Sequence, residues 1–152
     1  MDMSLREKLV VAGEQLSHSL RYSEQEMAQF AALTLDRNPL HFSPDIAGRA
    51  GFGGLIASGQ QTSAIMMGLL ATHFSRRDDG IAREMLCLNV NFAFKTPLLA
   101  GQDIDIVWTV ASADWHSKLD GMLTQLDGHA TPRGGAKPAV VGRATILVKF
   151  EP

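Results

Sequence analysis

The sequence predicts an α+β fold in which antiparallel strands form one sheet against a single long helix. A strand and several helices come first, an apolar helical pattern occupies residues 59–75, and alternating patterns dominate after residue 85. The chain has 152 residues, of which 45% are hydrophobic and 20% are charged. This length and composition are typical of one soluble globular domain, so we expect residues 1–152 to form a single domain.

Charge and composition argue against several classes of partner. The formal net charge of −2 provides no basic excess, so we expect no nucleic-acid binding. The apolar stretch at residues 65–71 is too short to cross a bilayer, and residues 1–11 lack an apolar stretch of signal-peptide length. The single cysteine permits no intramolecular disulfide. We therefore expect a cytoplasmic protein that does not enter the membrane.

A strand and a capped helix are expected near the start of the chain. Alternation over residues 16–22 predicts the strand. Ser23, followed three residues later by Glu26, has the form of a capping box, and apolar residues at helical spacing follow it. We expect an amphipathic helix that ends near Leu35.

The turn after this helix holds a carboxylate and an imidazole, in the run Asp36-Arg37-Asn38-Pro39-Leu40-His41. Pro39 disfavours helix at the residue before it, so Asp36 and His41 lie on either side of a turn and their side chains can converge. Such a pair can move protons at neutral pH. From the residue types alone, the favoured interpretation is instead a helix end followed by an Asx-type turn, with His41 at the surface.

Glycines follow the turn and limit the next helix, which Ser43-Pro44-Asp45 begins, to a short segment. Gly51-Phe52-Gly53-Gly54 fits neither a Walker motif nor a dinucleotide fingerprint, so we discount a nucleotide-phosphate role. The glycines instead indicate that the backbone passes close to another element or to a ligand.

Ser58 is the expected N-cap of a long helix over residues 59–75. Apolar residues cover so much of this helix that we expect it to be largely buried against a sheet. The first N–H groups of a helix have no internal partners and carry a partial positive charge. This helix start is therefore a candidate site for stabilising a negative oxygen, or simply the entry to a core helix.

The rest of the chain is predicted to form strands. Met85 to Lys95 alternates, which places Leu86, Leu88, Val90, Phe92 and Phe94 on one face. Cys87 lies in an apolar run, so we expect a buried and unreactive thiol. Further strands are expected over residues 104–110 and 140–150, with a less regular one over 118–130. We expect Trp108 in the core. The histidines outside the turn show no metal-ligand spacing, and we expect no metal: His18, His73, His116 and His129.

The turn motif resembles the D-x-N-P-x-H signature of the MaoC-like dehydratases, a family that includes (R)-specific enoyl-CoA hydratases. The similarity continues through Phe52-Gly53-Gly54-Leu55-Ile56-Ala57-Ser58-Gly59 and resumes at Val90 to Pro97 with Gly101-Gln102-Asp103. It covers most of residues 20–110. The chain departs from the family where many relatives have A-H-G, because Ser58 replaces the histidine, and Gln60-Gln61 is more polar than usual.

This resemblance implies a hot-dog fold, in which a curved antiparallel sheet wraps a long central helix, and a homodimer or a dimer of dimers. It implies an acyl-CoA thioester as substrate, with coenzyme A as part of the substrate and no separate cofactor. Asp36 would activate water, His41 would bind water and donate a proton, and the Gly59 N–H would polarise the thioester carbonyl. The residues expected to shape the substrate site are Asn38, Phe52, Gly54, Ser58 and Gln60.

Three functions follow as alternatives. The preferred one is reversible addition of water to a 2-enoyl thioester, which requires a base, an acid and a donor to the carbonyl. A hot-dog thioesterase would direct water at the carbonyl carbon instead. A non-catalytic acyl-CoA-binding subunit is the third, because a fold does not by itself establish an activity.

Overall fold

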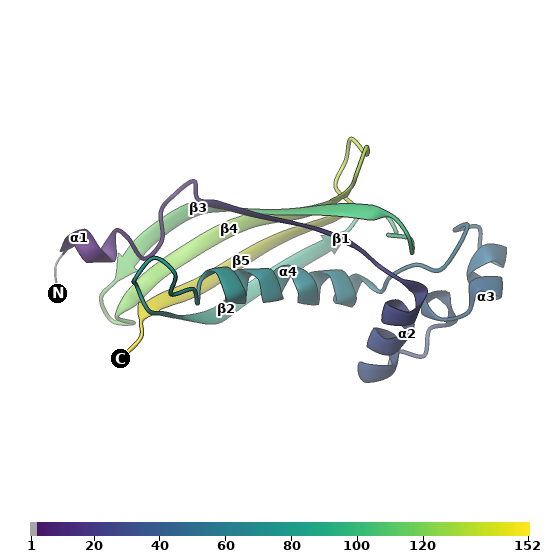
Figure 1. Cartoon of the computed structure of the whole chain (residues 1–152), viewed down its shortest axis with the longest axis horizontal. Coiled ribbons are helices and arrows are strands. Elements are labelled where there is room, and N and C mark those ends of the chain that lie inside the picture. Colours follow the sequence, from purple (N-terminus) through teal and green to yellow (C-terminus); the bar gives the residue numbers. More distant parts are fainter. Residues whose placement is uncertain (1–2) are drawn as a thin grey trace.

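The computed structural model describes residues 3–152 and is built on one five-stranded antiparallel sheet in the order β1-β3-β4-β5-β2 (Figure 1). The strands are β1 (Gln15–Arg21), β2 (Arg83–Phe94), β3 (Asp103–His116), β4 (Gly121–Pro132) and β5 (Val140–Phe150). The helices are α1 (Met3–Arg6), α2 (Glu24–Leu33), the 3₁₀ helix η1 (Pro39–His41), α3 (Pro44–Arg49) and α4 (Gly59–His73). The predicted α+β plan is confirmed.

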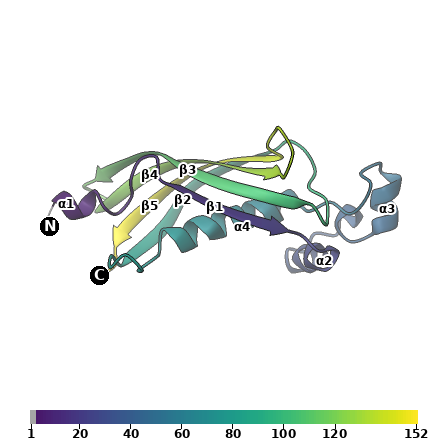
Figure 2. The ribbon, with the colours of Figure 1, turned by 45° about the horizontal axis from the view of Figure 1, so that its top comes forward.

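The long helix α4 lies along one face of the sheet, while α2 and α3 lie beyond one end of it (Figures 1 and 2). The capping box predicted at the start of α2 is present: Ser23 Oγ accepts from the Glu26 N–H, and the Glu26 carboxylate accepts from the Ser23 N–H. The helix α1 and the C-terminal end of β5 lie at the opposite end of the sheet from α2 and α3. The segment between β1 and α4 therefore leaves the sheet and returns to it.

The helix α4 is buried on one side only. Thr62, Met66 and Leu70 are buried, whereas Ala64, Gly68 and Ala71 are exposed in the single chain. The expectation of a largely buried helix was thus too broad, because the sheet covers just one side. The buried side carries larger apolar residues and the exposed side carries small ones, so the two sides of α4 differ in side-chain size as well as in polarity.

Trp108 lies at the centre of the core, as predicted, and is fully buried on β3. Its indole N–H donates to the carbonyl oxygen of Met66 at 2.9 Å, which ties the sheet to α4. Its ring lies over Gly128 of β4, where an added Cβ would be 2.3 Å from the nearest ring carbon. The missing side chain at this position is what allows the indole to lie flat on the sheet.

A β-bulge in β2 changes which residues face the helix. The pairing register shifts between Cys87 and Asn89, so Leu88 has no partner on β5. Directly paired residues of antiparallel strands share a face. Val90 pairs with the buried Ala144, but Leu86 pairs with Leu147, whose neighbours Ile146 and Val148 face the core. The prediction that Leu86 and Val90 share a face was wrong, because the bulge reverses the alternation.

Cys87 is exposed in the single chain, and the expectation of a buried thiol was wrong. The cause is the position of β2 at the edge of the sheet, which leaves one side of the strand uncovered. The irregular strand expected over residues 118–130 is a regular one, β4, and the strand expected at 104–110 extends to His116. A second bulge, between Val110 and Ser112, interrupts the alternation in the middle of β3.

Charged side chains connect separate segments of the chain at the end of the sheet opposite α2 and α3. The Glu14 carboxylate, just before β1, accepts from His73 Nε2 at 2.7 Å and from the Arg76 guanidinium at 2.9 Å. The fully buried side chain of Arg83 donates to Asp79 and to the carbonyl oxygen of Leu9.

Within residues 3–152, no helix is both long enough and apolar enough to cross a membrane.

Candidate active site

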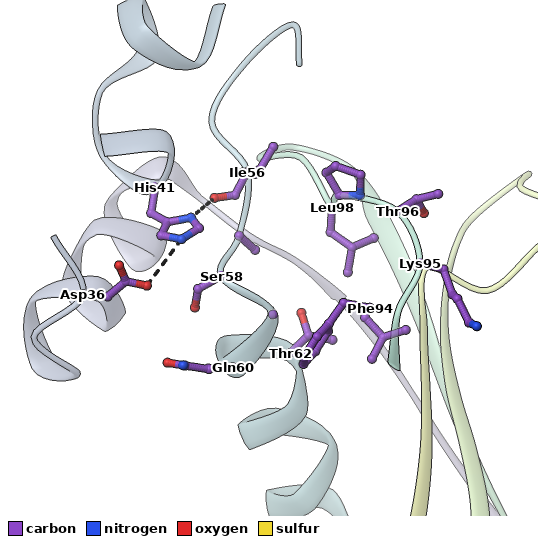
Figure 3. Close-up of a pocket in the computed structure, with 14 residues that line it drawn as sticks. Asp36, His41, Ile56, Ser58, Gln60, Thr62, Phe94, Lys95, Thr96 and Leu98 are labelled. Carbon is purple, nitrogen blue, oxygen red and sulfur yellow. Dashed lines mark hydrogen bonds and ion pairs between the residues drawn. The ribbon is translucent and has the colours of Figure 1, made fainter. Parts of the chain in front are cut away.

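A pocket of about 440 Å³ opens where the turn between α2 and η1 meets the start of α4 and the end of β2 (Figure 3). This volume lies in the range of small-molecule sites. The polar residues that line it are Asp36, His41, Ser58, Gln60, Thr62, Lys95 and Thr96. The remaining lining residues are mainly apolar: Ile56, Ala57, Gly59, Phe94, Pro97, Leu98 and Val140.

A Schellman motif at the end of α2 positions Asp36. The N–H of Asp36 donates to the Ala31 carbonyl at 2.8 Å, and the N–H of Leu35 donates to the Ala32 carbonyl at 3.3 Å. Leu35 adopts the left-handed conformation that this motif requires, with φ of 60°. A leucine is strained there, so the surrounding structure holds the turn that directs Asp36 into the pocket.

Asn38, which was expected to shape the substrate site, stabilises the turn but does not line the pocket. Its side-chain oxygen accepts from the Leu40 N–H at 3.2 Å and so caps η1. Its own N–H donates to Asp36 Oδ1 at 3.0 Å, which forms an Asx turn. One carboxylate oxygen of Asp36 is thereby held by the backbone, and the other is free to face His41.

His41 is buried at the inner wall of the pocket, where two contacts fix its ring. Nδ1 lies 2.8 Å from the carbonyl oxygen of Ile56, which can only accept, so Nδ1 carries a hydrogen. Nε2 lies 3.4 Å from Asp36 Oδ2 (Figure 3). In the neutral ring, Nε2 presents a lone pair beside the carboxylate, and together they can accept both hydrogens of one water molecule.

The start of α4 supplies hydrogen-bond donors to the same pocket. Ser58 is the N-cap, and its Oγ accepts from the Gln61 N–H at 3.2 Å. The N–H groups of Gly59 and Gln60 have no acceptor among residues 3–152. They carry the partial positive charge of the helix start, so the pocket contains acceptors on one wall and free donors on another.

Gly59 lies directly under the ring of Phe94, the last residue of β2. A Cβ added at Gly59 would lie 2.7 Å from two carbons of that ring. Thr62, one turn further along α4, is oriented by the buried hydroxyl of Tyr22 at 2.8 Å. Burial is the main cause that raises the pKa of Tyr22, so its hydroxyl stays neutral at neutral pH.

Phe52 and Gly54, which were expected at the substrate site, lie in the loop before Ile56 and outside the pocket lining. Phe52 donates its N–H to the Ala47 carbonyl at 3.4 Å, at the end of α3. A Cβ on Gly54 would lie 4.0 Å from the Leu99 side chain. This loop delivers the Ile56 carbonyl to His41, so its part in the site is indirect.

Sequence reasoning missed Ile56, Thr62 and several apolar lining residues. Ile56 acts through its backbone oxygen, which every residue type possesses. Phe94 had a signal, because it belongs to the block Phe94-Lys95-Thr96-Pro97 in which the family resemblance resumes. Among residues 3–152, no group of three or more His, Cys, Asp or Glu side chains is arranged to hold a metal ion.

Comparisons with known proteins agree with the resemblance in the sequence. A family model described as "MaoC like domain" matches residues 8–126. An (R)-specific enoyl-CoA hydratase of Aeromonas caviae is 28% identical over 134 residues, which cover 88% of this chain and 92% of the relative. A mitochondrial 3-hydroxyacyl-[acyl-carrier-protein] dehydratase of Arabidopsis thaliana is 25% identical over 81% of this chain and 76% of that relative.

Solved structures place the fold in the same group. The structure of an (R)-hydratase from A. caviae involved in PHA biosynthesis matches with a TM-score of 0.76 and 27% identity, over 93% of this chain and 98% of that one. A MaoC-like dehydratase from Rhodospirillum rubrum matches with a TM-score of 0.76 at 22% identity, over 95% and 97% of the two chains. The predicted hot-dog fold is confirmed.

Proposed function

Because this chain belongs to the MaoC-like family, we propose that it adds water reversibly to a 2-enoyl thioester to give the 3-hydroxyacyl thioester. The observation that carries the proposal is the approach of Asp36 Oδ2 to His41 Nε2 at 3.4 Å, in a pocket that the unpartnered N–H groups at the start of α4 also enter. A base, an acid and an electrophilic donor are the groups that this reaction requires.

In the proposed reaction, one water molecule lies between Asp36 and His41. Asp36 takes a proton from this water as its oxygen bonds to C3 of the substrate. The π electrons of the C2–C3 double bond move toward the thioester oxygen, where the Gly59 N–H stabilises the enolate. The proton that Asp36 has taken passes from Oδ2 to the lone pair of His41 Nε2, 3.4 Å away, and from Nε2 to C2, so the Asp36–His41 pair ends the cycle in its starting protonation state. Each acid–base role contributes roughly 10²–10⁴ in rate.

The substrate proposed is an acyl-CoA, in which coenzyme A is part of the reactant and no separate cofactor takes part. The A. caviae relative is named for enoyl-CoA and the A. thaliana relative for an acyl-carrier-protein substrate, and these names support a thioester in either case. Assays with the same 2-enoyl chain on coenzyme A and on acyl carrier protein compare the two carriers directly.

The test follows absorbance of the enoyl-thioester band with crotonyl-CoA and longer 2-enoyl-CoAs, together with free thiol. We expect loss of the band without thiol release, and a fall of at least about 10² in kcat for Asp36→Asn. Asp45→Asn is the matched control, because Asp45 is exposed on α3 and pairs with Arg49 away from the pocket. Thiol release would instead indicate a thioesterase, and binding without turnover would indicate a non-catalytic subunit.

We also propose that the chain forms a homodimer through the free edge of β2. This strand ends the sheet, and four large apolar side chains on it are 41–53% exposed: Leu86, Leu88, Val90 and Phe94. An open edge with apolar side chains is suited to pairing with another strand. A second copy of β2 presents the same edge and the same side chains, and Phe94 would place it beside the pocket.

Sedimentation of the parent and of Val90→Lys tests the dimer. The parent is expected at twice the chain mass and Val90→Lys at the mass of one chain, because a charge would be buried in the interface. Leu33→Lys on α2 is the control, since Leu33 is more exposed than Val90 but lies away from the sheet edge. A parent that sediments as a monomer at micromolar concentration would contradict the proposal.

A further inference from the structure

Ser58 has a hydrogen-bonding capacity that its structural role leaves unused. Its side chain is one of the few polar ones that are nearly fully buried, with the residue 5% exposed. The Oγ accepts from the Gln61 N–H at 3.2 Å, which occupies one lone pair. No group among residues 3–152 accepts the hydroxyl hydrogen. A buried O–H without an acceptor is unfavourable, so this hydrogen is available to a ligand.

The hydroxyl lies in the pocket already described. Ser58 lines it together with Asp36, His41 and Gly59. In Figure 3 the Ser58 oxygen projects to the side of the pocket where the Asp36 carboxylate and the Gln60 amide lie. Because Ser58 directly precedes Gly59, its O–H and the unpartnered Gly59 N–H are neighbouring donors at one helix start. An oxygen bound at this helix start lies within reach of both donors.

We propose that Ser58 is a catalytic residue, whose O–H donates a second hydrogen bond to the thioester oxygen as negative charge develops there. This inference rests on the proposed function. The O–H bond stays intact: water adds to C3, the electron pair moves to the thioester oxygen, and Ser58 and Gly59 each donate one hydrogen bond to it. The serine stands where many relatives have histidine, so the paired donor distinguishes this chain from them.

The competing explanation is that Ser58 only caps α4, and the chain contains a matched control for it. Ser23 caps α2 in the same way, accepting from the Glu26 N–H at 3.1 Å, but does not line the pocket. Ser58→Ala and Ser23→Ala should therefore lower the melting temperature by similar amounts. Only Ser58→Ala should lower kcat, by about 10²-fold, with KM changed far less. Ser58→Thr keeps the cap and the hydroxyl and should retain most of kcat.

A vibrational measurement tests the contact without turnover. In an Asp36→Asn background, which retains Ser58 but lacks the proposed base, Raman difference spectra report the C=O stretch of a bound 2-enoyl-CoA. A donated hydrogen bond lowers this frequency, so adding Ser58→Ala should raise it, while adding Ser23→Ala should leave it unchanged.

The outcomes separate the two proposals. Unchanged kcat in Ser58→Ala, or an unchanged carbonyl frequency, would overturn the role of Ser58 while leaving hydration intact. A parent that binds 2-enoyl-CoA without hydrating it would overturn the proposed function, and the frequency comparison would still decide whether Ser58 contacts the carbonyl. A parent that binds no thioester would overturn both.

Discussion

Replacing Gly59 by alanine should separate the activity of this protein from its stability. The added Cβ would lie 2.7 Å from two carbons of the Phe94 ring and 2.9 Å from a third. Favourable separations between carbon atoms are about 3.5–4.0 Å, so the ring must move by roughly 1 Å. Phe94 is 53% exposed in the single chain and is the last residue of an edge strand, so its ring can shift away from Gly59.

Two opposing terms make the stability change small. Overpacking costs about 1–3 kcal/mol in a closed core and less where the neighbour can move. Alanine is favoured over glycine by about 1 kcal/mol in a helix interior, which is the upper bound at Gly59, the first residue of α4. The free energy of unfolding should therefore change by no more than about 1 kcal/mol, a shift in melting temperature of roughly 2–4 °C. The pocket wall, however, moves by about 1 Å beside the Gly59 N–H, and a displacement of that size can lower kcat/KM about 10²-fold.

Gly68→Ala provides the control on the same helix. Gly68 is exposed and an added Cβ there would have no neighbour within 4 Å, so this variant should gain about 1 kcal/mol and keep its activity. Urea denaturation and hydration of crotonyl-CoA would be measured on both variants. Parental kcat/KM in Gly59→Ala would contradict this prediction, and so would a loss of more than about 3 kcal/mol, which indicates a closed core at Phe94.

Three further outcomes follow from contacts elsewhere in the chain. Gly128→Ala should lose about 3 kcal/mol in urea denaturation, because its Cβ would lie 2.3 Å from the fully buried Trp108 ring, which has no room to move. Burial raises the pKa of Glu14, but the hydrogen bond from His73 and the other favourable contacts of the carboxylate outweigh it, so the folded pKa lies below 4.5. The carboxylate therefore stabilises the fold above about pH 4.5, and this stabilisation is lost as the pH falls through the pKa of Glu14 in the folded state. Glu14→Gln should lower the midpoint of urea denaturation at pH 7, and the midpoint of this variant should decrease less than that of the parent below about pH 4.5. Leu35→Gly should relieve left-handed strain of about 1–2 kcal/mol against an entropic cost of about 0.5–1 kcal/mol, for a net gain of up to about 1.5 kcal/mol in thermal unfolding; a loss of more than about 1 kcal/mol would contradict this prediction.

The parts of the site that the sequence predicted are those governed by local chemistry. The capping serines Ser23 and Ser58 act on N–H groups three residues away, and both were visible as residue types at fixed spacing. The turn at Pro39, which lies between Asp36 and His41, made their convergence possible, and the family resemblance made it the preferred interpretation. Such interactions form within a few residues, so a pattern in the sequence is enough to predict them.

The parts that escaped prediction depend on which segments meet in the folded chain. The Ile56 carbonyl, 15 residues along the chain, accepts a hydrogen bond from the His41 ring. A contact made by a backbone oxygen leaves no signal in the residue type, so the sequence could not predict it. The faces of β2 depend on a bulge that arises from pairing with β5, so a strict two-residue period assigned Leu86 to the wrong side. The exposure of Cys87 reflects the position of its strand at the sheet edge, which only the strand order defines.

The two bulges also lie at one level of the sheet. Leu88 is the unpaired residue of β2 opposite Thr145 and Ile146 of β5, and Thr145 pairs with Gln125 of β4, which borders the second bulge, at Ala111 of β3. A β-bulge bends its strand and increases the local twist, so β2 and β3 both bend at this level, whereas β4 and β5 pair there without a register shift. Deleting Leu88 or Ala111 would remove a bulge and leave the other residues of the strand opposite their present partners, whereas deleting a paired residue would shift the register and move the side chains beyond it to the opposite face of the sheet. Length changes at the paired positions of β2 and β3 are therefore far less tolerable than at the two bulges.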